Sequence, residues 1–176
     1  MPIKKIDVMS RASAIWLFGR QFTEQMNPLK TAMISISSRD QQTPDFNMDG
    51  SNGLIKTCLM SFDDEEQGTS GCIEQKDAEK IADFVRSIEN DNELERLVVH
   101  CGAGVSRSAG VAAACSLYLL GDDSEFFSSH YCPNRTCYRM VLDALLVPLT
   151  DEQIDERFGR NKKEYWAKRR EELGID

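Results

Sequence analysis

Apolar and polar residues occur in two periodic patterns along the chain, and each pattern predicts a different secondary structure. Short apolar stretches, rich in β-branched residues or alternating with polar ones, predict strands at 3–8, 31–37, 54–62 and 97–99. Apolar residues spaced three or four positions apart predict helices at 12–25, 76–88, 108–120, 138–146 and 151–173. A shorter helix is predicted from Asp122 toward Phe127, and the polar stretch 38–53 is predicted to be a long loop. Strands that alternate with helices indicate a single α/β domain with a central, mostly parallel sheet flanked by helices.

The last segment of the chain differs from the rest in composition. Residues 151–176 are strongly charged, and their lysines and arginines are interleaved with glutamates, which is typical of a solvated helix rather than of a basic docking surface. The large apolar side chains that could anchor it are Phe158, Tyr165 and Trp166. We therefore predict a principal domain at 1–150 and a charged helical extension of that same domain at 151–176.

Composition and charge narrow the classes of function. With 41% hydrophobic and 28% charged residues, the 176-residue chain has the balance of an ordinary soluble domain. Its formal net charge of -8 argues against nucleic acid as a partner, because phosphate backbones are bound mainly by lysine and arginine. A pocket lined by backbone amides and one arginine can nevertheless bind a single phosphate in an acidic protein.

Targeting and redox signals favour a cytoplasmic location. The start of the chain lacks the apolar stretch of a secretory signal, and the longest apolar stretch, 111–120, is well short of the roughly twenty residues that span a membrane. We therefore expect no membrane partner. Six cysteines without an export signal predict free thiols in a reducing compartment. Because no CxxC pair is present and there are only two histidines, we expect neither a metal site nor another cofactor.

The strongest chemical signal is the stretch His-Cys-Gly-Ala-Gly-Val-Ser-Arg-Ser at 100–108, which lies between an apolar strand and a helix. Glycines let successive backbone N–H groups point inward as a nest for an anion, and the N-terminus of the next helix adds positive potential. We expect this field, together with Arg107, to hold Cys101 as the nucleophilic thiolate. Arg107 is placed to bind two phosphoryl oxygens. Ser108 is placed to hydrogen-bond the sulfur, and His100 to orient the loop.

These residues match the signature His-Cys-x-x-Gly-x-x-Arg-Ser, and over about residues 3–146 the chain resembles the protein tyrosine phosphatase superfamily. The compact dual-specificity-like branch, with its small bacterial members, is the most similar. The resemblance implies a phosphatase (dual-specificity-like) fold, a phosphatase domain at 1–150 and a phosphocysteine intermediate that forms without metal. It identifies Cys101, Arg107 and Ser108 as catalytic. It assigns phosphate binding to the loop of Gly102, Ala103, Gly104, Val105, Ser106 and Arg107.

Cleavage of a phosphate ester also needs a proton for the leaving oxygen, and the resemblance implies an aspartate just after the strand at 54–62. Asp63 and Asp64 both stand there. If the strand continues, alternation puts Asp64 on the same side as Phe62, and the Phe-x-Asp pattern of small bacterial relatives also favours Asp64. Asp63 stays open as the alternative general acid, since either carboxylate could instead cap a turn. Glu65 and Glu66 are expected to face solvent.

The resemblance implies a protein phosphatase for phosphotyrosine, with phosphoserine and phosphothreonine as the further substrates of a dual-specificity enzyme. The expected partner is therefore a phosphorylated protein or peptide. Two alternatives stay open: a phosphate-binding interaction module with weak catalysis, and a phosphatase for a non-protein phosphomonoester. Relatives that have lost catalysis typically lack the cysteine, the arginine or the acid, whereas all three positions are filled here.

Overall fold

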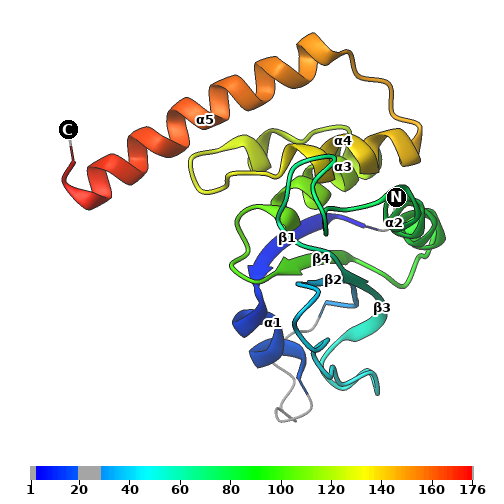
Figure 1. Ribbon diagram of the computed structural model, residues 1–176. Helices are drawn as coiled ribbons and strands as arrows, with labels where there is room; N and C mark the ends of the chain where they lie inside the picture. The colour runs from blue at the N-terminus through cyan, green and yellow to red at the C-terminus, as the bar shows by residue number, and fades with distance from the viewer. Residues whose placement is uncertain (1–2, 20–28, 176) are drawn as a thin grey trace.

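A computed structural model describes residues 3–19 and 29–175 of the protein. Within these residues, four strands form one sheet: β1 (Lys5–Ser10), β2 (Thr31–Ser37), β3 (Leu54–Ser61) and β4 (Arg96–Cys101). The strand order is β1-β4-β2-β3, and each neighbouring pair is parallel. The predicted α/β class with a mostly parallel central sheet is confirmed (Figure 1).

The helices lie at or near their predicted places. They are α1 (Arg11–Phe18), α2 (Gln75–Glu89), α3 (Arg107–Leu120), α4 (Arg135–Leu145) and α5 (Asp151–Leu173), with a 3-10 turn, η1 (Ser124–Phe127), between α3 and α4. Among the described helices, none is long and apolar enough to cross a membrane.

The first helix is shorter than the sequence predicts. Its start agrees with the prediction, because Ser10 Oγ accepts a hydrogen bond from the Ser13 N–H at 3.1 Å and so caps the helix. The helix ends at Phe18, since Gly19 has extended backbone and pairs with Phe46 in an isolated antiparallel bridge. The prediction of a helix at 12–25 is therefore wrong at residue 19, and residues 20–25 lie outside the described part of the chain.

Two other helices differ from their predictions. The helix predicted from Asp122 is only the short turn η1, and the Asp122 carboxylate, which precedes it, accepts the Ser124 N–H at 3.0 Å. Helix α4 begins at Arg135, three residues before its predicted start, because Asn134 Oδ1 accepts the Cys137 N–H at 2.8 Å and caps it. The bounds of α5 agree with the prediction.

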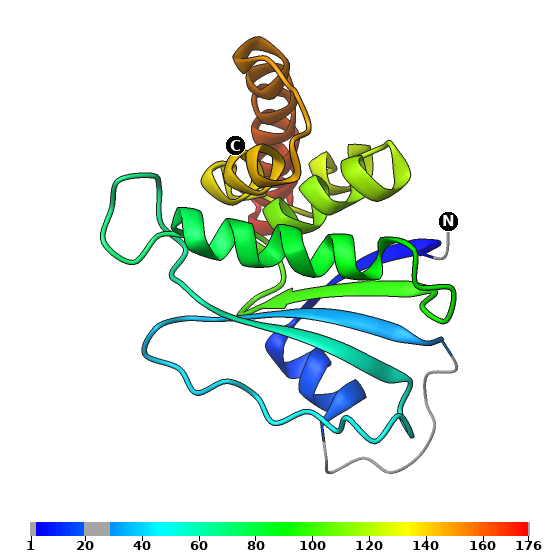
Figure 2. The same ribbon diagram turned by 90° about the vertical axis from the view of Figure 1, so that its right-hand side faces the viewer.

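The sheet separates two apolar cores. Helices α2 and α3 lie on one face with α4 packed on them, and α1 lies on the other face together with the loop 38–53 (Figure 2). Alternate side chains of β2 serve the two cores: Met33 packs with Phe18 and Phe46, whereas Ile34 and Ile36 pack in the larger core under the helices. Each such buried side chain contributes about 2 kcal/mol. Because all strands are parallel, their carboxyl ends meet at one edge, and the loops after β1, β2, β3 and β4 gather there.

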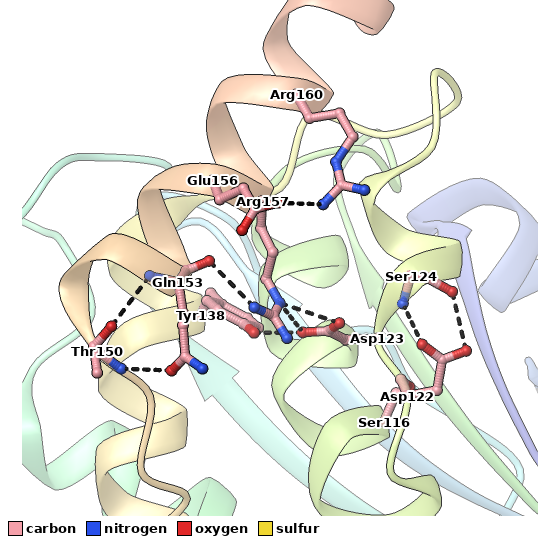
Figure 3. Close-up of polar contacts among 10 residues, drawn as sticks. All are labelled: Ser116, Asp122, Asp123, Ser124, Tyr138, Thr150, Gln153, Glu156, Arg157 and Arg160. Carbon is pink, nitrogen blue, oxygen red and sulfur yellow. Dashed lines mark hydrogen bonds and ion pairs between the residues drawn. The ribbon is translucent and has the colours of Figure 1, made fainter.

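Helix α5 is attached by its first half, and its C-terminal end extends past the rest of the molecule (Figure 1). Phe158 packs against the ring of Tyr138, with centroids 5.7 Å apart. Arg157 Nε donates to the Asp123 carboxylate at 3.0 Å, and Asp123 also accepts the hydroxyl of Tyr138 (Figure 3). Of the possible anchors, Phe158 packs on the rings of Phe127 and Tyr138, whereas Trp166 is 51% exposed.

Candidate active site

The predicted phosphate loop connects the end of β4 to the start of α3. Cys101 is the last residue of β4 and Arg107 the first of α3, so the loop comprises residues 102–106. Cys101 is buried, and its Sγ lies 3.1 Å from the hydroxyl oxygen of Ser108, which is also buried. The structure therefore brings the predicted thiol and its predicted hydrogen-bond partner together at the edge where ligands bind to parallel sheets.

The backbone carbonyls of the loop are hydrogen-bonded by the surrounding protein. The Gly102 carbonyl accepts the Arg11 N–H at 3.0 Å, the Val105 carbonyl accepts the Cys132 N–H at 3.1 Å, and the Ser106 carbonyl accepts the N–H of residue 134 at 3.0 Å. In the described part of the chain, no backbone carbonyl accepts the N–H groups of residues 103–106. Hydrogen-bonded carbonyls, together with free N–H groups at a helix N-terminus, are the features of an anion-binding nest.

One glycine of the loop is required by its conformation. Gly104 has φ +74, and a Cβ placed on it would lie 2.5 Å from the backbone carbon of Met9 at the end of β1. Any side chain would therefore push the loop off the strand. Gly102 has no such constraint, because a Cβ there would meet only Arg107 Nη2, at an ordinary 3.6 Å. The backbone conformation therefore requires glycine at position 104 but not at position 102.

Arg107 lies buried at the base of the site. Its side chain is 6% exposed, and its Nη1 donates to the Phe62 carbonyl at 2.6 Å. This bond links the phosphate loop to the residue that precedes Asp63 and Asp64. Arg107 Nε is buried and has no hydrogen-bond acceptor among the described residues. Leaving a buried donor without an acceptor costs about 1–3 kcal/mol of folding free energy. An anion that accepts a hydrogen bond from Nε would remove this cost, so the guanidinium is suited to bind one.

His100 is a buried, neutral residue behind the loop. Its Nε2 lies 2.7 Å from Ser35 Oγ and its Nδ1 lies 3.5 Å from the Cys101 carbonyl oxygen. Since a carbonyl can only accept, Nδ1 carries the hydrogen and Nε2 accepts the Ser35 hydroxyl. Burial, aided by the charges of Arg11 and Arg107, lowers the pKa of His100 to about 4. The ring is therefore suited to orienting the strand end rather than to carrying protons at neutral pH.

The two candidate acids point to different places. Asp64 Oδ1 accepts hydrogen bonds from Ser106 Oγ at 2.7 Å and from Asn134 Nδ2 at 2.9 Å, so its carboxylate lies at the rim of the phosphate loop. Asp63 Oδ1 instead accepts the backbone N–H of Arg39 at 3.0 Å, in the loop after β2. Its other oxygen lies beside Gly71, within its own loop. Of the two candidates, the structure brings Asp64 to the cysteine loop.

Asn134 has a place in the site that the sequence analysis did not assign. It caps α4 with Oδ1, donates to Asp64 with Nδ2, and binds the Ser106 carbonyl with its N–H. An asparagine after proline, just before a helix, is a recognisable N-cap signal. Its contacts with Asp64 and Ser106 are not recognisable, because 70 residues separate it from Asp64.

The acidic loop after β3 is held over α4 by a second contact. The Gln67 N–H donates to Thr136 Oγ at 2.9 Å, and Thr136 lies in the first turn of α4.

Across residues 3–19 and 29–175, no three His, Cys, Asp or Glu side chains are grouped so that they could hold a metal ion. All six cysteines are free thiols.

Several solved structures have a similar course of the chain. Human DUSP28 is 13% identical, with a TM-score of 0.44, over 93% of this chain and 94% of that one. A mouse putative dual specificity phosphatase, complexed with zinc tungstate, is 16% identical, with a TM-score of 0.37, over 80% of this chain and 74% of that one. Tk-PTP in its active form is 14% identical, with a TM-score of 0.39, over 90% of each chain.

The mouse protein carries the name of the dual-specificity branch that the sequence resembles. At such identities and TM-scores the likeness concerns the fold, and the chemistry has to be argued from this chain's own residues. No protein-family model matches the chain, and no curated protein matches it either.

Proposed function

We propose that the protein is a cysteine-dependent protein phosphatase, which hydrolyses phosphotyrosine and, with dual specificity, phosphoserine and phosphothreonine. The observation that carries the proposal is the unused hydrogen-bonding capacity around one thiol. Free backbone N–H groups at 103–106 and the buried, unpaired Arg107 Nε lie in the loop that begins at Cys101. A tetrahedral oxyanion offers acceptors for all of these donors, and a phosphoryl group would bring its phosphorus to the sulfur.

In the first step, the Cys101 thiolate attacks phosphorus and the bond to the leaving oxygen breaks. The loop N–H groups and Arg107 stabilise the negative charge that builds on the three equatorial oxygens. Asp64, in its protonated form, gives its proton to the leaving oxygen. The products of this step are an alcohol or phenol and a phosphocysteine.

In the second step, water attacks the phosphocysteine and the sulfur–phosphorus bond breaks. Asp64, now a carboxylate, accepts the proton of the attacking water. Ser108 donates a hydrogen bond to the departing sulfur, for which its position 3.1 Å from Cys101 Sγ is suitable. Inorganic phosphate leaves, and no step requires a metal ion or another cofactor.

Hydrolysis of p-nitrophenyl phosphate in the presence of EDTA tests the proposal. The wild-type protein is expected to turn over, and Cys101→Ser is expected to lose about 10⁴-fold or more in kcat/KM, because the serine hydroxyl is a far weaker nucleophile at neutral pH. Turnover that survives Cys101→Ser would contradict the mechanism. Tight vanadate binding without turnover would favour the phosphate-binding module instead.

Phosphopeptides test the substrate class. Peptides with the same flanks and either phosphotyrosine, phosphoserine or phosphothreonine should all be hydrolysed if the enzyme has dual specificity. Turnover of small phosphomonoesters without turnover of any phosphopeptide would favour the non-protein substrate.

We also propose a cytoplasmic location, which the six free thiols support and which cell fractionation tests.

A further inference from the structure

A groove runs from the candidate active site along the base of α5. It has a volume of about 1160 Å³ and lies between the acidic loop after β3, α4 and α5. Its lining includes Asp64, Ser106 and Asn134 of the candidate active site, and Phe158 and Trp166 of α5. The groove therefore adjoins the Cys101 loop at Ser106.

The α5 wall of the groove is fixed to the body of the protein. Asn161 is 2% exposed, and its Nδ2 donates to the carbonyls of Ser128 at 2.9 Å and Tyr131 at 3.0 Å. The contact of Arg157 with Asp123 secures the preceding turn of the helix (Figure 3). Buried contacts of this kind make the groove a standing feature of the fold.

The opposite wall is fixed where the acidic loop meets α4. The backbone N–H of Gln67 and the carboxylate of Asp64 are both hydrogen-bonded to the first residues of α4 or its cap. These bonds hold the acidic loop beside α4, so that the charge of the loop can select among substrates.

Negative charge dominates the groove. Its ionisable residues are Asp64, Glu65, Glu66, Asp143, Asp151 and Asp155 against Arg135, Arg139 and Lys162. Both arginines are already neutralised, because Arg135 pairs with Asp155 and Arg139 pairs with Asp143 and Asp151.

The excess charge lies nearest to the phosphate loop. Glu65 and Glu66 are exposed, and neither forms an ion pair with a described residue. Uncompensated carboxylates beside an anion site attract a ligand that carries a phosphate and positive charge close together.

We propose that this groove binds the chain that flanks the phosphorylated residue of a peptide substrate and selects lysine or arginine there. The inference rests on the proposed function and names the substrate class of that same site. Glu65 and Glu66 attract the cationic side chains, and the exposed ring of Trp166 offers a face on which a guanidinium or ammonium group can lie. An acidic flank would instead meet like charge at Glu65 and Glu66.

Kinetics with a matched peptide series tests the inference. Peptides share one phosphorylated residue and differ only in flanks of Lys/Arg, Gly/Ser or Glu, and each kcat/KM is divided by that for p-nitrophenyl phosphate. The basic peptide should exceed the acidic one by about three- to tenfold at low salt, as expected for a few exposed charge pairs. The ratio should shrink as salt is added, because exposed charges are screened.

Two double variants locate the effect. Glu65→Gln/Glu66→Gln should bring the preference for the basic peptide down to about twofold or less, since the two uncompensated carboxylates are removed. Glu164→Gln/Glu171→Gln makes the same change in net charge on exposed residues of α5 that do not line the groove. This control should keep the full preference. Equal loss in both variants would show that net charge, and not the groove, selects the peptide.

Binding provides a readout that does not depend on turnover. In Cys101→Ser/Trp16→Phe, Trp166 is the sole tryptophan, because the chain has two. The fluorescence of Trp166 should change at a lower concentration of the basic phosphopeptide than of the acidic one, because the basic peptide binds more tightly.

The outcomes separate the two proposals. If the wild type does not hydrolyse p-nitrophenyl phosphate, the proposed function fails. If hydrolysis depends on Cys101 but the peptides show no charge preference, or prefer acidic flanks, only the groove inference is overturned.

Discussion

The phosphate loop and the acidic loop meet at one edge of the sheet but are held there in different ways. The phosphate loop is tied through its own carbonyls to Arg11, Cys132 and Asn134, and its cysteine and arginine are buried. The acidic loop is mostly exposed and is attached through a few side-chain hydrogen bonds, such as those at Asp64 and Gln67. The loop proposed to bind an anion is therefore rigid, and the loop that carries Asp64 is weakly attached.

The energetic contrast has a consequence for catalysis. A hydrogen bond near the surface contributes only about 0.5–1.5 kcal/mol, so the acidic loop can detach and return at little cost. Moving the phosphate loop would break several backbone bonds and expose Arg107. Substrate exchange is therefore expected to proceed by motion of the acidic loop, while the donors that stabilise the transition state stay in place.

The largest effect is expected inside the rigid loop. Arg107→Lys should lower kcat/KM for p-nitrophenyl phosphate by about 10³-fold, because an ammonium cannot both bind the Phe62 carbonyl and donate bidentately to phosphate. Circular dichroism checks that the variant is folded. Activity within tenfold of wild type would show that the loop does not depend on this guanidinium.

A smaller but selective effect is expected in the acidic loop. Asp64→Asn should lose about 10²-fold in kcat, and more with phenyl phosphate than with p-nitrophenyl phosphate, because the poorer leaving group needs the proton more.

Asp63→Asn is the matched control. It should stay within about threefold of wild type, because the amide oxygen can still accept the N–H of Arg39. If the two variants exchange behaviour, Asp63 is the acid.

His100, which lies behind the phosphate loop, makes the free energy of unfolding depend on pH. Its pKa of about 4 in the folded protein lies below the value of about 6.5 in an unfolded chain, so the unfolded state binds more protons between these values. The contribution is fully present above about pH 6.5 and is lost as the pH falls toward 4.

Urea unfolding at about pH 7.5 and pH 4.5 measures this contribution. The loss of stability between the two should be smaller in His100→Gln than in wild type by on the order of 2 kcal/mol. His130→Gln, at an exposed site, serves as control and should keep the wild-type loss. Identical pH dependence in His100→Gln would contradict the assignment of a buried neutral imidazole.

The smallest effect is expected where the two loops meet. Asn134→Ala removes the cap of α4 and the bond to Asp64, and should cost about 1 kcal/mol of stability and about three- to fivefold in kcat. Thr150→Ala removes a comparable cap from α5, where Thr150 accepts the Gln153 N–H, and should lower stability alone. Equal kcat values in both variants would assign Asn134 a purely structural role.

Much of the fold could be predicted because its signals are local. Strand β4, the loop and α3 follow one another without interruption, so Cys101, Arg107 and Ser108 had to lie close together. The end of α1 could not be predicted, because Gly19 leaves the helix to pair with Phe46, far along the chain. The anchoring of α5 was only partly predictable, since apolar residues at helical spacing do not reveal which of them meet the core.

The sequence by itself determined the α/β class and the loop of Cys, Gly and Arg residues for which we propose anion binding, because periodicity, glycine and the order Cys–Gly–Arg act over a few residues. Only the tertiary structure decided which carboxylate reaches that loop, that Asn134 joins the two loops, and that α5 closes a negatively charged groove beside them. These features depend on strand register and on helix docking, which bring together residues separated by tens of positions. A local sequence pattern cannot predict such contacts.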